Sequence, residues 1–143
     1  MSNIIGTLGV DGAANLFLLN PNGIVFGETA QLDINGSFIT STADSIDFGN
    51  DNFFSAVNPQ TAPLLAINTP IGLQYGTATS EIRVEGSGSQ VFFDFNTDLT
   101  NKSQRPNGLE VPVGETLALL GGEIIMDGGN LTGAGGHIEL AAE

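Results

Sequence analysis

The sequence predicts an all-β fold made of short strands joined by Asn- and Gly-rich corners. The chain has 20 Gly among its 143 residues, many Asn and a single Lys. Gly and Asn are poor in helix interiors and are favoured in tight turns. Apolar residues also alternate with polar ones in short runs, which is the period of a strand with one buried face. The composition therefore opposes long helices, and the periodicity favours strands.

The alternation is first clear in QLDINGSF, where the apolar residues Leu32, Ile34 and Phe38 are all at even-numbered positions and so point to one face of a strand. It returns in SIDFG (Ile46, Phe48), EIRVEG (Ile82, Val84), QVFFDF (Val91, Phe93, Phe95), LEVPV (Leu109, Val111, Val113) and HIEL (Ile138, Leu140). Each of these segments is predicted to be a strand with the named apolar residues facing the core. The one segment with helical character is GETLALLGG, residues 114–122, which its Gly pair would end after about a turn and a half.

The corners between these strands allow two topologies. Asn-Gly and Asp-Gly are strong hairpin signals, but they also suit the corners of a parallel β-helix, in which each coil stacks on the last. Gly pairs recur every six or seven residues in GGEIIMDGGNLTGAGG, which favours coils of short strands. A repeat 21 residues apart agrees, because Leu117, Leu119 and Gly121 are matched by Ile138, Leu140 and Ala142. At that length the chain would hold roughly six or seven coils.

Two segments interrupt the pattern within what is otherwise predicted to be a single domain over residues 1–143. Residues 96–108, NTDLTNKSQRPNG, contain two of the three basic residues. They are predicted to form an exposed loop or a segment that projects from the β-helix. NDNFFSAVNPQTAP, residues 50–63, mixes turn-forming residues with Phe53 and Phe54. These two side chains are expected to cover an open edge or end of the core.

Charge and composition exclude several classes of function. Sixteen acidic residues stand against Arg83, Lys102 and Arg105, which gives a formal net charge of −13. Such a charge opposes binding to phosphate backbones and to anionic membrane surfaces, so we predict no nucleic-acid partner. No apolar run approaches the roughly 20 residues of a spanning helix, so no membrane insertion is predicted. The lack of Cys excludes disulfides, zinc thiolate sites and a Cys nucleophile.

Carboxylates and one histidine are the candidates for catalysis. His137, the only His, alternates outward in HIEL and is expected to be a solvated strand residue. Glu81, Arg83 and Glu85 share one strand face, and Asp94 and Asp98 would share another if that strand continued. Acid clusters of this kind serve β-helical polysaccharide lyases and hydrolases, so a carbohydrate-active enzyme is an alternative function. A lyase needs several basic side chains to neutralise an acidic sugar, and this sequence has only three, which are dispersed. We therefore predict no catalytic residues.

Metal and glycan binding are further alternatives. GGEIIMDGGNLTGAGG has the Gly/Asp composition of calcium-binding β-rolls but lacks their nonapeptide register, so no metal site and no cofactor are predicted. A glycan-binding adhesive module would present exposed aromatic side chains on one face. Tyr75 is the only Tyr and there is no Trp, which gives this alternative little support.

Residues 6–49, GTLGVDGAANLFLLNPNGIVFGETAQLDINGSFITSTADSIDFG, resemble the N-terminal haemagglutination-activity domain, also called the two-partner secretion domain, of the filamentous haemagglutinin family. Residues 109–143, LEVPVGETLALLGGEIIMDGGNLTGAGGHIELAAE, are similar to the closing coils of that domain, particularly in cyanobacterial-type exoproteins. The most specific feature is NPNGI set between NLFLL and AQLDINGSFI. The resemblance implies a right-handed parallel β-helix that catalyses no reaction.

The resemblance also implies partners and a location. In that family the domain targets a large exoprotein for secretion: POTRA repeats of a dedicated outer-membrane transporter recognise it in the periplasm, and it nucleates folding of the downstream passenger outside the cell. The expected location is therefore the medium or the cell surface, reached through the periplasm. The family's long N-terminal segment is not seen before residue 1, so the chain is expected to lack that part. An open coil end is expected to permit self-association.

Carried over residue by residue, the family's asparagine motif falls on Asn20, Pro21, Asn22, Gly23 and Ile24. Pro21 fixes φ at the first central position of a turn, and the following Asn and Gly tolerate positive φ, so the motif predicts a sharp corner. The side chain of Asn20 is expected to bond the backbone two residues on, as in an Asx turn. Corner geometry is sufficient to explain the motif, and direct contact with the transporter is the alternative.

Overall fold

A computed structural model describes residues 1–49, 52–57, 72–76, 80–88, 92–94, 99–101 and 108–143. This part of the chain is all-β, as predicted, and its strands pair mainly in parallel sheets. It contains no helix of the length and apolarity needed to cross a membrane.

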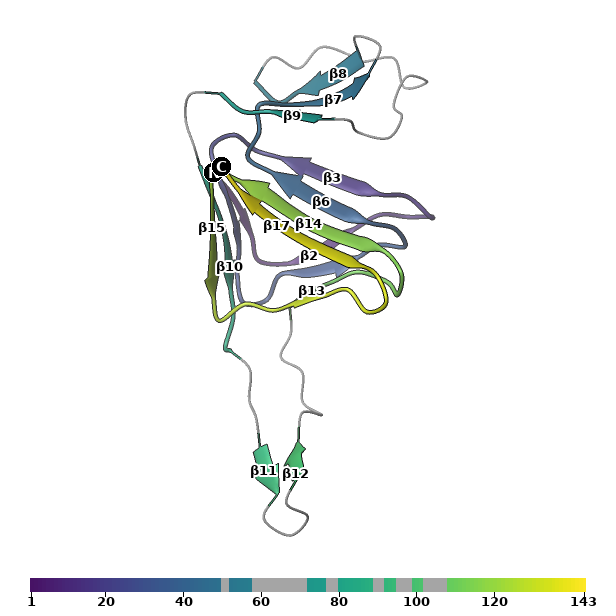
Figure 1. Cartoon of the computed structure of the whole chain (residues 1–143), viewed down its shortest axis with the longest axis vertical. Helices are drawn as coiled ribbons and strands as arrows, with labels where there is room; N and C mark the ends of the chain where they lie inside the picture. The colour runs from purple at the N-terminus through teal and green to yellow at the C-terminus, as the bar shows by residue number, and fades with distance from the viewer. Residues whose placement is uncertain (50–51, 58–71, 77–79, 89–91, 95–98, 102–107) are drawn as a thin grey trace.

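One parallel sheet has the strand order β1-β4-β10-β15 (Figure 1). Its strands are β1 (Ser2–Ile4), β4 (Ile24–Phe26), β10 (Glu81–Glu85) and β15 (Glu123–Asp127). Ser2 is in register with Ile24, which lies 22 residues further along the chain. Ile82 is in turn aligned with Ile24 and with Ile124, so side chains of one type stack across the sheet. Ile24 and Ile82 are fully buried, because this row faces the core.

A second parallel sheet has the order β17-β14-β6-β3. Its strands are β3 (Leu16–Leu19), β6 (Phe38–Ser41), β14 (Thr116–Gly121) and β17 (His137–Ala142). The predicted 21-residue repeat is confirmed, because it gives the register of β14 and β17: Leu117 pairs with Ile138, Leu119 with Leu140 and Gly121 with Ala142.

The prediction of helical character in GETLALLGG is wrong. Residues 116–121 form β14, which is a central strand paired with β6 on one side and β17 on the other. Leu117, Ala118 and Leu119 are all buried, as is expected of a central strand that is covered on both faces. Two hydrogen-bonded neighbours therefore override the weak helix preference of a Leu-rich segment.

Four short strands complete the parallel arrangement. β2 (Thr7–Gly9) pairs with β5 (Gln31–Asp33), and β13 (Leu109–Glu110) pairs with β16 (Leu131–Thr132), in two separate sheets. No parallel sheet in the described ranges has more than four strands, which corrects the expectation of six or seven coils. The chain leaves the parallel sheets after β6 and again after β10, so fewer residues contribute to them.

The two segments that leave the parallel sheets form small antiparallel sheets at opposite ends of the molecule (Figure 1). β7 (Ser45–Gly49), β8 (Asn52–Ser55) and β9 (Gly72–Gln74) make a sheet of order β8-β7-β9. β11 (Phe92–Asp94) pairs with β12 (Leu99–Asn101). β12 falls inside the predicted loop of residues 96–108, whereas residues 96–98 and 102–107 lie outside the described residues, so its exposure stays a prediction.

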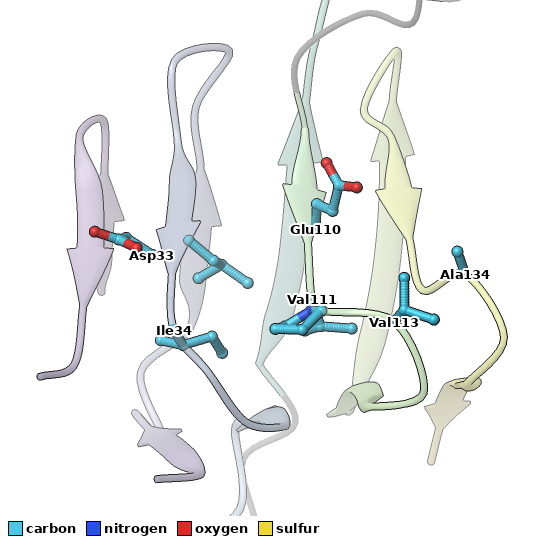
Figure 2. Close-up of a pocket in the computed structure, with 8 residues that line it drawn as sticks. Asp33, Ile34, Glu110, Val111, Val113 and Ala134 are labelled. Atoms are coloured by element: carbon cyan, nitrogen blue, oxygen red, sulfur yellow. The ribbon is translucent and has the colours of Figure 1, made fainter. Parts of the chain in front are cut away.

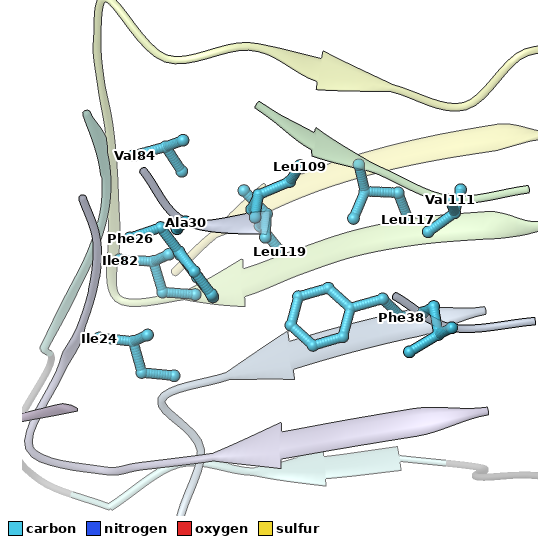
Figure 3. Packing of buried hydrophobic residues seen from close by; sticks show 11 residues of the cluster. Ile24, Phe26, Ala30, Phe38, Ile82, Val84, Leu109, Val111, Leu117 and Leu119 are labelled. Carbon is cyan, nitrogen blue, oxygen red and sulfur yellow. The ribbon is translucent and has the colours of Figure 1, made fainter. Parts of the chain in front are cut away.

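The core lies between the parallel sheets (Figure 3). Phe26 of β4 and Phe38 of β6 meet edge to face with ring centroids 6.0 Å apart. Aliphatic side chains from β10, β13 and β14 surround them, namely Ile82, Val84, Leu109, Leu117 and Leu119. Outside this cluster, Ile46 and Phe48 of β7 are buried, as the alternation predicted.

Several apolar residues predicted to face or cover the core are exposed instead. Phe53 is 58% exposed and Phe54 is also exposed, because β8 is an edge strand of its sheet. Ile138 and Leu140, which were predicted to face the core, are exposed like every other residue of β17, which is an edge strand. Val113 is 81% exposed because it follows the end of β13 rather than continuing the strand. Val91 and Phe95 lie outside the described residues.

Candidate functional site

The NPNGI motif forms the corner between β3 and β4. The Gly23 N–H donates to the Asn20 carbonyl oxygen at 3.1 Å, which closes a turn around Pro21 and Asn22. The Asn22 N–H donates to Asn20 Oδ1 at 2.9 Å, which confirms the predicted Asx turn. Gly23 has φ of 101°, a conformation that a residue with a side chain rarely adopts. The local sequence alone therefore accounts for the direction of this corner.

Contacts with distant segments hold the corner in place. Asn20 Nδ2 donates to Ser2 Oγ at 2.7 Å, and the Asn20 N–H donates to the Ser41 carbonyl oxygen at 3.0 Å. The Ser2 N–H donates to the Gly23 carbonyl oxygen at 2.9 Å. A Cβ on Gly23 would lie 3.2 Å from the Glu81 carbonyl oxygen, so β10 approaches the backbone closely here. Three segments that are far apart in sequence therefore meet at this corner.

The five motif residues divide into two groups by their burial and by the hydrogen bonds of their side chains. Ile24 is fully buried in the core, Gly23 is buried against its neighbours, and the side chain of Asn20 is engaged in both hydrogen bonds described above. Asn22 is exposed and Pro21 is half-buried. A partner that approaches this corner would therefore meet Pro21 and Asn22, whereas the other three residues shape the surface beneath them.

We expect Asn20→Ala to lower the free energy of unfolding by about 1 to 2 kcal/mol, because it removes two side-chain hydrogen bonds that join the turn to itself and to β1. Urea unfolding of the wild type and the variant measures this difference. Asn35→Ala is the control for loss of an Asn side chain at a corner, since Asn35 is exposed and precedes Gly36. Equal losses in the two variants would contradict a specific role for the Asn20 side chain.

The other predicted candidates do not assemble into a catalytic group. Arg83 Nε lies 3.4 Å from Glu81 Oε1, and its Nη1 lies 3.7 Å from Asp127 Oδ2 on the neighbouring strand β15. These groups, with Glu85, lie on the face of β10 opposite the buried Ile82 and Val84. Partly exposed ion pairs of this kind contribute little stability. They form a charged surface on the outer face of the sheet.

The remaining candidates are dispersed. His137 is exposed on β17, as predicted, with Nε2 3.7 Å from Glu139 Oε2. Tyr75 is half-buried, and its hydroxyl lies 3.3 Å from Ser41 Oγ, so it does not form part of an exposed aromatic face. Asp98 lies outside the described residues. Over the described ranges, no three His, Asp or Glu residues stand close enough together to hold a metal ion.

Comparison with known proteins identifies a family. The family described as "TPS secretion domain" matches residues 1–143, the whole chain. No curated protein and no solved structure matches the chain.

Proposed function

The chain belongs to the TPS (two-partner secretion) secretion domain family, and from this premise we propose that POTRA repeats of an outer-membrane transporter recognise it in the periplasm. The family match over the whole chain is the observation that carries the proposal, since it indicates a secretion-targeting module rather than an enzyme. The domain would lead a large exoprotein, a filamentous-haemagglutinin-type adhesin, through the transporter to the medium or the cell surface. The lack of Cys suits such passage, because no disulfide can block an extended chain.

We further propose that the parallel strands form a right-handed β-helix. Successive strands pair at similar separations, such as Ser2 with Ile24, Leu16 with Phe38 and Leu117 with Ile138. Separations of 21 or 22 residues lie in the range of repeat lengths of stacked architectures, and stacked coils of a β-helix would give them. The separations between β4 and β10, between β10 and β15, and between β6 and β14 are longer because antiparallel segments are inserted in the chain between these strands.

The last strands suggest how the domain could nucleate folding. β15, β16 and β17 each stand at the edge of their sheet. A strand edge presents backbone N–H and C=O groups that can pair with another strand. A downstream segment of the exoprotein would add to these three edges in turn and extend the stack. The same edges would also let two copies of this chain associate.

Within the corner, Asn22 is the residue best placed for recognition. Its side chain is exposed, while its backbone is fixed by the Asx turn and the neighbouring Pro21. A side chain presented on a rigid turn loses little conformational freedom when it binds, which favours affinity. Recognition through Asn22 would also explain why the motif combines an exposed amide with residues that only shape the turn.

The test is titration of the transporter's isolated POTRA repeats into the folded chain by calorimetry. We expect Asn22→Ala to weaken binding about tenfold, the size of effect typical of a central contact residue. Asn35→Ala, which changes an exposed Asn at another Asn-Gly corner, should bind as the wild type does. Equal binding of both variants and the wild type would leave the motif with a structural role only. Absence of binding by the folded wild type would contradict recognition by the POTRA repeats.

A further inference from the structure

Strand β1 is short, partly exposed and bound to the NPNGI corner. It has three residues and stands at the edge of its sheet. Ser2 and Ile4 are half-buried, whereas the apolar residues of the neighbouring strand β4, Ile24 and Phe26, are fully buried. Asn20 Nδ2 donates to Ser2 Oγ, and this bond joins the side chains of β1 and the corner. Release of β1 would therefore cost a three-residue ladder, this bond and the cover of one aliphatic side chain.

The chain beyond β1 allows this strand to move while the rest of the domain stays in place. Gly6 lies between β1 and β2, is exposed, and would meet no atom within 4 Å if it carried a Cβ. After it, β2 is paired with β5. Figure 2 shows Ile34, just after β5, and Val111, just after β13, on opposite sides of a hollow of about 300 Å³. Both side chains are buried in the core cluster, so β5 is anchored and Gly6 can act as a hinge.

The edge of β4 that β1 covers begins inside the NPNGI motif. The Ser2 N–H donates to the Gly23 carbonyl oxygen. Four residues further along, the Gly27 N–H donates to the Ile4 carbonyl oxygen. Because the backbone groups of alternate residues face the same edge of a strand, the N–H and C=O of Val25 also face β1. Release of β1 would open the whole of this edge, and extended peptides bind to sheet edges of this kind.

The side chains of β1 define what could replace it. The Ser2 hydroxyl accepts from the Asn20 amide. Ile4 is in register with Phe26 and packs against the core. A replacement strand therefore needs Ser or Thr at the first position and Ile, Val or Leu two residues later. The residues before its Ser or Thr would lie beside Asn22, which is exposed and directly precedes this edge.

We propose that an extended strand of the transporter's POTRA repeats, in which Ser or Thr is followed two residues later by Ile, Val or Leu, displaces β1 and pairs with β4. The inference rests on the proposed function. It gives the two asparagines of the motif separate tasks: Asn22 is the exposed contact for the incoming strand, and Asn20 holds β1 until that strand binds. Because one strand replaces another of like chemistry, the core stays covered and the backbone hydrogen bonds are remade.

The test locks β1 to β4 and measures binding of the isolated POTRA repeats by calorimetry. Asn3 and Val25 are in register and the chain has no Cys, so Asn3→Cys/Val25→Cys places one disulfide between the two strands. The oxidised variant is expected to bind about tenfold more weakly than the wild type, and reductant should restore the affinity. Thr7→Cys/Gln31→Cys is the matched control, because it locks β2 to β5 at exposed positions in register and should bind equally in both redox states.

A second variant loosens β1 instead of locking it. Ser2→Ala removes the acceptor of the Asn20 amide and should raise the affinity for the POTRA repeats about threefold, because β1 is displaced more readily. Ser87→Ala, at an exposed Ser elsewhere, should leave the affinity unchanged. Weaker binding by Ser2→Ala would contradict the proposal, since it would make Ser2 a contact of the partner rather than part of a strand that leaves.

The outcomes separate this inference from the function on which it rests. Binding by the wild type, with equal affinities for the oxidised and reduced forms of the β1–β4 lock, would overturn the replacement of β1 while leaving recognition by the transporter intact. Absence of binding by the folded wild type would overturn both. Dimerisation of the wild type that the lock abolishes, with binding of the repeats unchanged, would assign the edge of β4 to β1 of a second copy and overturn the transporter's strand as its occupant.

Discussion

Phe38→Ala is expected to lower the free energy of unfolding by about 3 to 5 kcal/mol, the usual cost of removing a buried aromatic side chain. Phe38 is fully buried at the centre of the core. It pairs in register with Leu16 on one side and Leu117 on the other, and its ring meets that of Phe26. Because domains of this size are stable by only about 5 to 15 kcal/mol, the variant would lose a large share of its stability.

Urea unfolding monitored by circular dichroism measures this loss, and Phe53→Ala is the matched control. Phe53 is 58% exposed on the edge strand β8, so its removal should change the free energy of unfolding by less than about 1 kcal/mol. If the two substitutions destabilised the chain equally, the core would not be centred between the parallel sheets.

Features with a signal in the local sequence or in a sequence repeat could be predicted. The alternation of Ile82 and Val84 placed a strand with the correct buried face, because burial of one strand face imposes a period of two. The Asx turn of Asn20 followed from the tendency of an Asn side chain to bond the backbone two residues on. The 21-residue repeat found the pairing of β14 with β17, since stacked strands of one sheet need matching side chains.

Features that depend on distant segments could not be predicted in this way. Alternation distinguishes the two faces of β17, but whether Ile138 and Leu140 are covered depends on what packs against that strand. The hydrogen bond from Asn20 to Ser2 and the approach of Glu81 to Gly23 also join segments without a local signal.

The largest effect on function is expected in export. The chain belongs to a secretion-domain family, so its passage across the outer membrane should depend on the partner transporter. With a signal peptide placed before residue 1, we expect the chain to reach the medium in cells that produce the transporter and to remain in the periplasm in cells that lack it. Asn22→Ala should reduce export in the first cells, and Asn35→Ala, its matched control, should not.

Quantification of the chain in medium and periplasm, with and without the transporter, is the most direct measurement of the central claim that this is a secretion-targeting domain. Nearly complete dependence of export on the transporter is the predicted result. Equal amounts in the medium of both kinds of cell, or retention of the folded chain in the periplasm of both, would contradict it.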